Sequence, residues 1–519
     1  MKAALRDALI IVVTACCAGL HAQPGSGAGF RPEIPKTWDD AAMAALEIPL
    51  ANPTGSPKHV SSDYYYKIPA RPIYRSYPIY APGHEPPGYL DWLKQREPQV
   101  IWDDAGHRPT LEKEADWIKA GEIVFDAPTG FQGVRAVVTA SDVQNPRWWA
   151  SVGAQFAKDG TLPGYRYVIR KKAQVEVGSL SCASCHTRLM PDGTVIKGAQ
   201  GNFPFDRVLG FIFRTAPPQA MMDVRLGNYR LYGAPWVNPD PQARLLQMSL
   251  DEIASAHEAI PSGVQARHRS SPFYPVQVPD LIGVKDRHYL DRTGLQPHRG
   301  LVDLMRYAAL NQGGDDLASF NGFVPDGLPD FKTLPPPDKL DPFRTQPDRY
   351  TDEQLYALAL YVYSLHPPPN PNKFDAEAAR GQRIFNREGC AGCHTPPLYT
   401  NNELTLAEGF TSPPGAEQKY DILSLSVGTD PNLALKTRRG TGYYKVPSLI
   451  GVWYRGMFGH SGWCATLEDW FDPRRTRNDY VPTGFQPYGT KTYAVKGHLF
   501  GLNLSAEDKK ALIAFLKTI

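Results

Sequence analysis

The pentapeptide Cys-x-x-Cys-His occurs twice in this 519-residue chain, and no other feature restricts its fold and chemistry as strongly. In this pattern the two cysteines bond covalently to the vinyl groups of a haem, and the adjoining histidine binds the haem iron from the same side. The residues concerned are Cys182, Cys185 and His186 in the first copy, and Cys390, Cys393 and His394 in the second. The sequence therefore predicts two covalently bound haem c groups, with His186 and His394 as iron ligands.

Other interpretations of a Cys-x-x-Cys pair are a structural zinc site, a disulfide and a redox-active dithiol. None of them requires a histidine directly after the second cysteine, so two copies that both carry it favour haem. Of the 7 cysteines, Cys16 and Cys17 lie in the leader and four lie in the motifs. The remaining one, Cys464, is expected to be a buried apolar thiol.

The N-terminus has the pattern of a secretory signal. Lys2 and Arg6 precede an apolar run over residues 8–20, which is too short to span a bilayer and is followed by polar sequence. Cleavage after Ala22 would place the mature chain in the periplasm or outside the cell. Alternatively, the segment ending at Cys16 resembles a bacterial lipobox, and lipidation there would make the protein a lipid-anchored lipoprotein, the one case in which a membrane is a partner. A net charge of +3 gives no reason to expect nucleic acid as a partner.

Two units follow the same order of a helix, a haem motif, a Val-Pro-x-Leu-Ile-Gly-Val segment and a closing helix. The expected helices are Glu114 to Asp126, Asp352 to Leu365, Ala376 to Arg387 and Ser505 to Ile519. The expected domains are a signal peptide over residues 1–22, an N-terminal arm over 23–110, a first cytochrome c-like domain over 111–370 and a second over 371–519. A long insertion precedes the first motif, and its β-branched stretches at Val134 to Thr139 and Tyr165 to Val177 predict a small sheet.

The fold class expected from these features is mainly α. It would consist of two cytochrome c-like haem domains in tandem, the first enlarged by the small β insertion. The arm is rich in Pro and Tyr, and because disordered tails are poor in aromatic residues, we expect it to be extended and packed on the surface of the domains.

The second unit resembles the bacterial di-haem cytochrome c peroxidases and their relatives, which include the di-haem rubber oxygenases. The similarity lies in three segments, Val446 to Val452, Met457 to Gly462 and Thr466 to Glu468, with Ser461 standing where the family usually has Asp. The resemblance implies two haem domains and an oxidoreductase. Because the family's distal ligand to the C-terminal haem comes shortly before the last helix, it also implies His498 in that role, with His460 and Met457 as alternatives. A calcium ion between the domains is known in related peroxidases, and no residue pattern here supports one.

The first unit has no counterpart of His498, since neither His nor Met occurs from Tyr307 to Ser364. We therefore expect the His186 haem to be five-coordinate or to hold an exchangeable ligand. Arg306 and Asn311 are weak candidates for hydrogen-bond donors in its distal pocket, and Phe320 for an apolar wall. Ordinary structural roles explain these three residues equally well.

The predicted function is that of an exported di-haem c-type cytochrome, a peroxidase-like or oxygenase-like oxidoreductase. The His394 haem would relay electrons, and the His186 haem would react with peroxide or dioxygen. The partners would be a small redox protein or another electron donor or acceptor, and a substrate that the sequence does not define. The alternative is a non-catalytic di-haem electron-transfer protein, in which an outside histidine completes the first haem. The candidates for that ligand are His257, His288 and His298.

Overall fold

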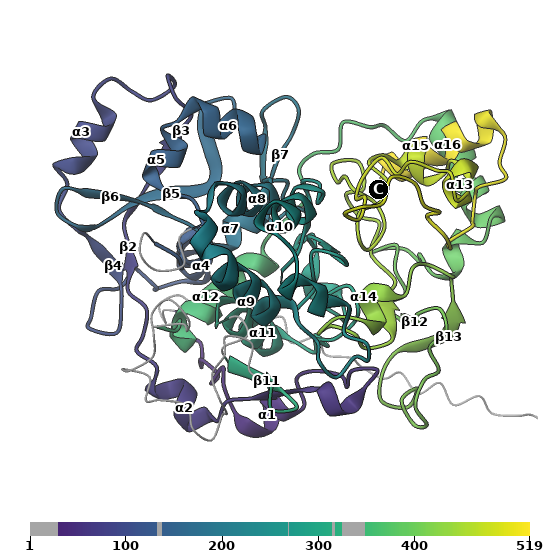
Figure 1. Ribbon diagram of the computed structural model, residues 1–519, viewed down its shortest axis with the longest axis horizontal. Coiled ribbons are helices and arrows are strands. Elements are labelled where there is room, and N and C mark those ends of the chain that lie inside the picture. Colours follow the sequence, from purple (N-terminus) through teal and green to yellow (C-terminus); the bar gives the residue numbers. More distant parts are fainter. Residues whose placement is uncertain (1–29, 132–136, 268, 314–316, 324–347) are drawn as a thin grey trace, which may run out of the picture.

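The computed structural model describes residues 30–131, 137–267, 269–313, 317–323 and 348–519. The expected signal peptide and Cys16 lie outside these residues. Figure 1 shows one body built from the N-terminal two thirds of the chain and a second built from the C-terminal helices α13, α15 and α16. No helix among the described residues is long and apolar enough to cross a membrane.

The expected mainly α fold class is wrong. Among the described residues 34% are helical and 14% are in strands, which form several small sheets in a mixed α/β fold. The reason lies in the connections. The chain contains 49 Pro and 45 Gly, which end helices early. Most of the strands in the loops between them have only two or three residues, too few to show a period in the sequence.

Two crossed helix pairs form the framework of the two units. The pairs are α4 (Glu114–Asp126) with α12 (Asp352–Tyr363), and α13 (Ala376–Arg387) with α16 (Ala506–Lys517). All four helices confirm the sequence prediction to within two residues at each end. Side-chain caps begin two of these helices, since the Thr351 side chain accepts a hydrogen bond from the Gln354 amide and the Ser505 side chain accepts one from the Asp508 amide.

A glycine stands where each pair crosses. A Cβ atom on Gly121 of α4 would lie 2.0 Å from the Ala357 carbonyl oxygen of α12, and one on Gly381 of α13 would lie 1.9 Å from the Ala511 carbonyl oxygen of α16. Both distances are far below van der Waals contact. At both crossings, therefore, the glycine has no side chain, and this allows the two helix backbones to come into contact.

The insertion before the first motif contains the expected sheet. β5 (Thr161–Lys171) and β6 (Gln174–Gly178) are antiparallel, and β3 (Ser76–Tyr80) pairs with the other edge of β5 to give the order β3-β5-β6. The prediction for Tyr165 to Val177 is thus confirmed. Of the other stretch, residues 134–136 lie outside the described residues, and Thr139 caps the short helix α5 (Ala140–Val143) instead of continuing a strand.

The N-terminal arm is part of the first unit's core, which differs from the extended surface arm that the sequence predicts. Trp38 stacks on Tyr65 with ring centroids 4.3 Å apart, and both belong to the hydrophobic cluster of α4 and α12. The arm also pairs its strands with the rest of the chain (β1 with β11, β3 with β5). Its elements are α1 (Asp40–Ala44), η1 (Pro53–Gly55), β1 (Pro57–His59), α2 (Ser62–Lys67), β2 (Ile73–Tyr74), α3 (Tyr89–Lys94) and β4 (Val100–Trp102).

The remaining elements connect these frameworks. In the first part of the chain they are α6 (Pro146–Val152), α7 (Cys182–Cys185), β7 (Thr187–Leu189), β8 (Val195–Lys197), α8 (Phe205–Thr215), η2 (Pro218–Ala220), α9 (Met221–Tyr232), η3 (Pro241–Leu246), α10 (Leu250–Glu258), β9 (Val264–Gln265), β10 (Val276–Gln277), η4 (Val284–Asp286), α11 (Leu301–Gly313) and β11 (Ala318–Phe320). In the last part they are η8 (Cys390–Gly392), β12 (Leu404–Leu406), β13 (Ile422–Ser426), α14 (Asn432–Leu435), β14 (Tyr443–Lys445), α15 (Leu467–Trp470) and η9 (Pro473–Thr476).

Candidate functional site

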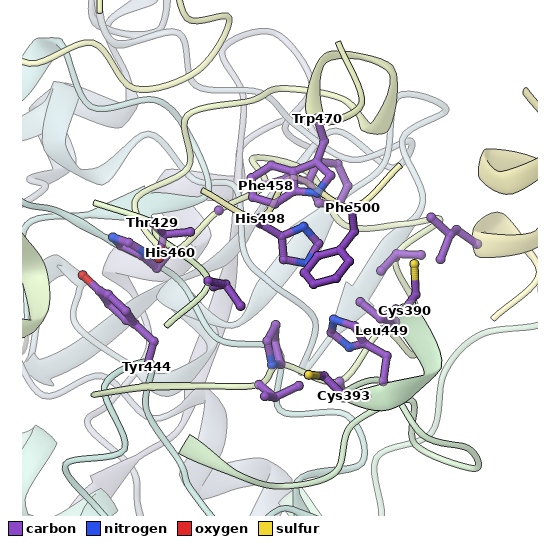
Figure 2. A pocket seen from close by; sticks show the side chains of 18 of the residues that line it. Cys390, Cys393, Thr429, Tyr444, Leu449, Phe458, His460, Trp470, His498 and Phe500 are labelled. Atoms are coloured by element: carbon purple, nitrogen blue, oxygen red, sulfur yellow. The ribbon is translucent and has the colours of Figure 1, made fainter. Parts of the chain in front are cut away.

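The second Cys-x-x-Cys-His motif lines a pocket in the C-terminal unit. Gly389 lies between α13 and the tight turn η8, which carries Cys390. Its φ of 79° is in the left-handed region that favours glycine. Cys390, Cys393 and His394 all line the pocket, which holds about 1440 Å³ of space between protein atoms, part of it open to solvent (Figure 2). Its walls are mostly apolar and come from both helices of the pair and from the repeated heptapeptide. The side chains are Phe385, Leu449, Val452, Phe458, Leu467, Trp470, Phe471, Phe500, Leu512 and Leu516.

Both motif histidines are held in the tautomer that an iron ligand requires. The Nδ1 of His394 lies 3.0 Å from the Tyr399 carbonyl oxygen, and the Nδ1 of His186 lies 3.0 Å from the Pro279 carbonyl oxygen. Because a carbonyl only accepts, each Nδ1 carries the proton, and the Nε2 lone pair is left to bind a metal. Burial lowers the pKa of both rings, that of His186 to about 4, so both are neutral at neutral pH.

The repeated heptapeptides hold these two histidines. Pro279 belongs to the first copy, Val278 to Val284, and its carbonyl accepts the bond from His186. The backbone of Pro447, at the same position of the second copy, Val446 to Val452, hydrogen-bonds to His394. The sequence shows the repeat but gives no role for it. In the structure, each copy contacts the motif histidine of its own unit.

His498 faces His394 across the pocket. Their ring centroids are 6.4 Å apart. Two imidazoles on opposite sides of one iron would place their centroids about 6 Å apart, given a metal–nitrogen bond of about 2 Å and roughly 1 Å from nitrogen to ring centre. Burial lowers the pKa of His498 to about 3, and its Nδ1 is buried without a hydrogen-bond partner among the described residues. The donors therefore fit a haem held by Cys390 and Cys393 with one imidazole on each face.

His460, the alternative ligand, lines the same pocket from a different side. Its ring stacks on Tyr444 with centroids 4.0 Å apart, and its Nε2 is buried without a partner in the part of the chain that the structure describes. Figure 2 shows it beside Tyr444 and Thr429, on the far side of His498 from Cys390. Met457, the other alternative, is not among the residues that line the pocket. The geometry favours His498 over both.

A fully buried arginine fixes the segment that carries His498. Arg475 donates from Nε to the Trp470 carbonyl (2.7 Å), from Nη1 to the Val495 carbonyl (2.6 Å) and from Nη2 to the His498 carbonyl (2.8 Å). Its guanidinium also bonds to the Gly497 carbonyl and lies over the Trp470 ring. His498 itself has φ 46°, a conformation that side chains rarely adopt without such support. Arg475 is thus a positioning residue that the sequence, which shows only a short basic run here, does not reveal.

We expect Arg475→Lys to loosen His498. An ammonium group cannot reproduce the fork of bonds to four carbonyls, so the free energy of unfolding should fall by about 2–4 kcal/mol. If the second motif binds haem as predicted, the absorption spectrum of the oxidised protein should also show a high-spin fraction from that haem. Arg474→Lys is the matched control, because Arg474 is exposed and forms its ion pair with the neighbouring Asp472. A spectrum unchanged by Arg475→Lys would exclude the positioning role.

The first motif forms the short helix α7 in the core of the N-terminal unit. The Ser181 side chain accepts a hydrogen bond from the Ser184 amide at 3.0 Å and caps this helix. Cys182 and Ala183 belong to the hydrophobic cluster of α4, α11 and α12. Arg267 and Tyr165 each interact electrostatically with this motif, and each has a buried polar atom without a hydrogen-bond partner among the described residues. Both are polar neighbours of the site that the sequence did not single out.

The three candidates for the distal pocket have structural partners. Arg306 donates to the Thr37 carbonyl and pairs with Asp303 at 3.1 Å. Asn311 hydrogen-bonds to the Tyr307 side chain, and Phe320 is fully buried and stacks on Trp236 with centroids 5.1 Å apart. These contacts account for all three positions, so a role for Arg306, Asn311 or Phe320 beside the first haem stays a prediction.

The histidines proposed to complete the first haem from outside are occupied elsewhere. The ring of His257 is buried with Nδ1 at 2.8 Å from Asp206 and Nε2 at 3.1 Å from Asn228. His298 donates from Nδ1 to the Arg287 carbonyl, and its Nε2 lies 2.7 Å from the Tyr363 hydroxyl. His288 is exposed and pairs with Asp421. Both ring nitrogens of His257 and His298 are thus already used.

Comparison with known proteins adds little. No family model matches the chain, and no curated protein matches it either. Among solved structures, hydrazine synthase from Kuenenia stuttgartiensis is 16% identical over 57% of this chain and 87% of its own, with a TM-score of 0.30. A MauG-like protein associated with microbial copper homeostasis is 20% identical over 32% of this chain and 56% of its own, with a TM-score of 0.22. At these TM-scores neither similarity supports an assignment of fold or activity.

Proposed function

We propose that this chain is an exported c-type cytochrome that carries two covalently attached haems and acts as an oxidoreductase. One observation carries the proposal: each motif presents two thiols and a neutral imidazole whose Nδ1 donates to a backbone carbonyl, and in the second unit His498 lies opposite that imidazole. Cys182, Cys185, Cys390 and Cys393 are all free of disulfides, so their sulfurs are available for thioether bonds.

The two units would have different tasks. In the second, His394 and His498 would occupy both faces of the haem, and the apolar walls of the pocket would limit access of water. A haem supplies a one-electron redox centre, and one with two protein ligands suits electron relay. In the first unit His186 would bind one face and leave the other for peroxide or dioxygen. Electrons would come from a small redox protein or another external donor.

A second candidate function, electron transfer without catalysis, is favoured by one observation. Met305 on α11 is fully buried and belongs to the same hydrophobic cluster as Cys182. If the Met305 thioether bound the first haem iron on the face opposite His186, the iron would have two protein ligands, as it has with Met and His in cytochromes c. Met305 lies just before the stretch from Tyr307 to Ser364, which contains neither His nor Met.

Low-temperature electron paramagnetic resonance on the oxidised protein, with carbon monoxide titration after reduction, separates the two functions. One high-spin and one low-spin ferric signal, with one carbon monoxide bound per chain, would support the oxidoreductase with an open His186 haem. Two low-spin signals and no binding would support electron transfer alone. In that case Met305→Ala should open the first haem, and its failure to do so would exclude Met305 as the ligand.

A further inference from the structure

Five cationic side chains gather between the two haem motifs, and we call them the interdomain cation cluster. They are Arg188, Arg287, Arg292, Lys445 and Arg455. Arg188 lies on β7, two residues after the first motif, whereas Lys445 ends β14 in the C-terminal part of the chain. Arg188 and Lys445 lie more than 250 positions apart in the sequence, so only the folding of the chain brings them together.

The cluster has far more positive than negative charge. Arg287 is 9% exposed, Arg292 is 8% exposed and the Arg455 side chain is 7% exposed. The buried carboxylate that faces them is Asp280, which lies 3.8 Å from the Arg455 Nε and also accepts a hydrogen bond from the Tyr454 hydroxyl. Asp291 is also close, but it already pairs with Arg439 at 3.3 Å. Unbalanced charges of one sign are costly to bury.

Several donors in the cluster are unsatisfied. The Nε atoms of Arg188, Arg287, Arg292 and Arg455 are all buried and have no hydrogen-bond partner among the described residues. Burial, together with the neighbouring positive charges, lowers the pKa of Arg292 to about 9 and that of Lys445 well below its usual value. Buried polar groups in proteins almost always form hydrogen bonds, so four guanidinium nitrogens in one place that lack a hydrogen-bond partner among the described residues indicate a missing anion.

The position of the cluster indicates which anion it is. Arg292, Lys445 and Arg455 line the same pocket as His394 and His498. The same three, with Arg287 and Asp280, line a smaller hollow that reaches Pro279, the residue whose carbonyl holds His186. The cluster therefore borders the second haem site and approaches the first.

We propose that the interdomain cation cluster binds carboxylates, namely the propionate groups of the haem in the His394 pocket, an inference that rests on the proposed function. Planar guanidinium groups bind carboxylates through two parallel hydrogen bonds, which would satisfy the unpaired nitrogens. The same chemistry would also attract a free oxyanion, such as phosphate or acetate.

A divalent cation would be repelled here, and no group of three or more His, Cys, Asp or Glu suited to a metal occurs among the described residues.

The test is a spectroscopic redox titration of the haem-loaded protein and its Arg292→Gln and Arg455→Gln variants. Positive charge beside a haem favours the reduced form, so removing one charge should lower the midpoint potential of one haem. We expect at least a tenfold fall in its ratio of reduced to oxidised form at a fixed potential, which is about 59 mV for one electron. Arg292→Lys keeps the charge and should shift the ratio less. The control is Arg438→Gln, which removes an equally buried arginine bonded to the Gly233 carbonyl and should leave both potentials unchanged.

Titration with phosphate and acetate at constant ionic strength distinguishes the two sources of the anion. Bound propionates predict potentials and a melting temperature that do not respond to either salt. A free anion predicts stabilisation of the wild type by one of them and loss of that effect in Arg292→Gln, a result that would contradict the propionate assignment. Unchanged potentials in both Gln variants, with no response to salt, would overturn the anion site altogether. The intact mass of each sample reports haem attachment separately, so a chain without haem would contradict the proposed function, while the salt titration would still test the cluster.

Discussion

Replacing His498 by alanine is expected to open the second haem, and carbon monoxide binding after reduction should rise by one molecule per chain. The low-spin ferric signal of that haem should become high-spin, because the imidazole opposite His394 at 6.4 Å is lost and the face it occupied becomes free. Absorption spectroscopy and carbon monoxide titration measure both changes. The apolar walls of the pocket remain intact, so the haem should stay attached.

His460→Ala is the matched control, since it removes the third histidine, besides His394 and His498, that lines the same pocket. Its spectrum should keep the low-spin signal, and it should bind no additional carbon monoxide. If His460→Ala opened the haem and His498→Ala did not, the ligand assignment would be reversed. If neither did, the sixth ligand would have to come from another side chain.

Replacing Gly381 by alanine is expected to destabilise the second unit by up to about 2 kcal/mol. The new Cβ would lie 1.9 Å from the Ala511 carbonyl oxygen and 2.8 Å from the Phe515 Cβ, so α13 and α16 must move apart. Overpacking of this kind costs about 1–3 kcal/mol or more, whereas the better helix propensity of alanine returns only about 1 kcal/mol. Urea denaturation of the haem-loaded protein, followed at the haem absorption, measures the change.

Gly227→Ala is the control for that experiment. Gly227 lies within α9, and a Cβ built on it meets no other atom within 4 Å. This variant should keep or slightly raise the free energy of unfolding, by up to about 1 kcal/mol. Equal effects of the two substitutions would show that the crossing of α13 and α16 does not depend on the glycine.

The sequence predicted the two helix pairs well because each helix is long enough for an amphipathic pattern and a cap to appear. α13 begins and ends where it was expected, and Ser505 caps α16. The fold class could not be predicted in the same way. Strands such as β1 or β12 have three residues, and they form because distant segments meet, which no local pattern records. The arm was predicted to lie on the surface, whereas Trp38 and Tyr65 are buried in the first core.

The residues of the candidate sites also include some that a local sequence pattern predicts and others that only the folded chain brings together. The motif residues can be found from the sequence because covalent haem attachment fixes their spacing within five positions. Arg475 and the interdomain cation cluster could not be found, since Arg188 and Arg455 become neighbours only after both units have folded together. The distal residues of the first haem rest on analogy. Arg306 and Phe320 have structural partners, and their role beside a haem stays a prediction.

Intact mass spectrometry under denaturing conditions tests the central claim most directly. The protein should be produced in a host that attaches haem to exported cytochromes, and the mature chain should exceed its polypeptide mass by two haem groups. The double substitutions Cys182→Ala with Cys185→Ala, and Cys390→Ala with Cys393→Ala, should each remove one of them. A wild-type chain with the mass of the bare polypeptide would contradict the account.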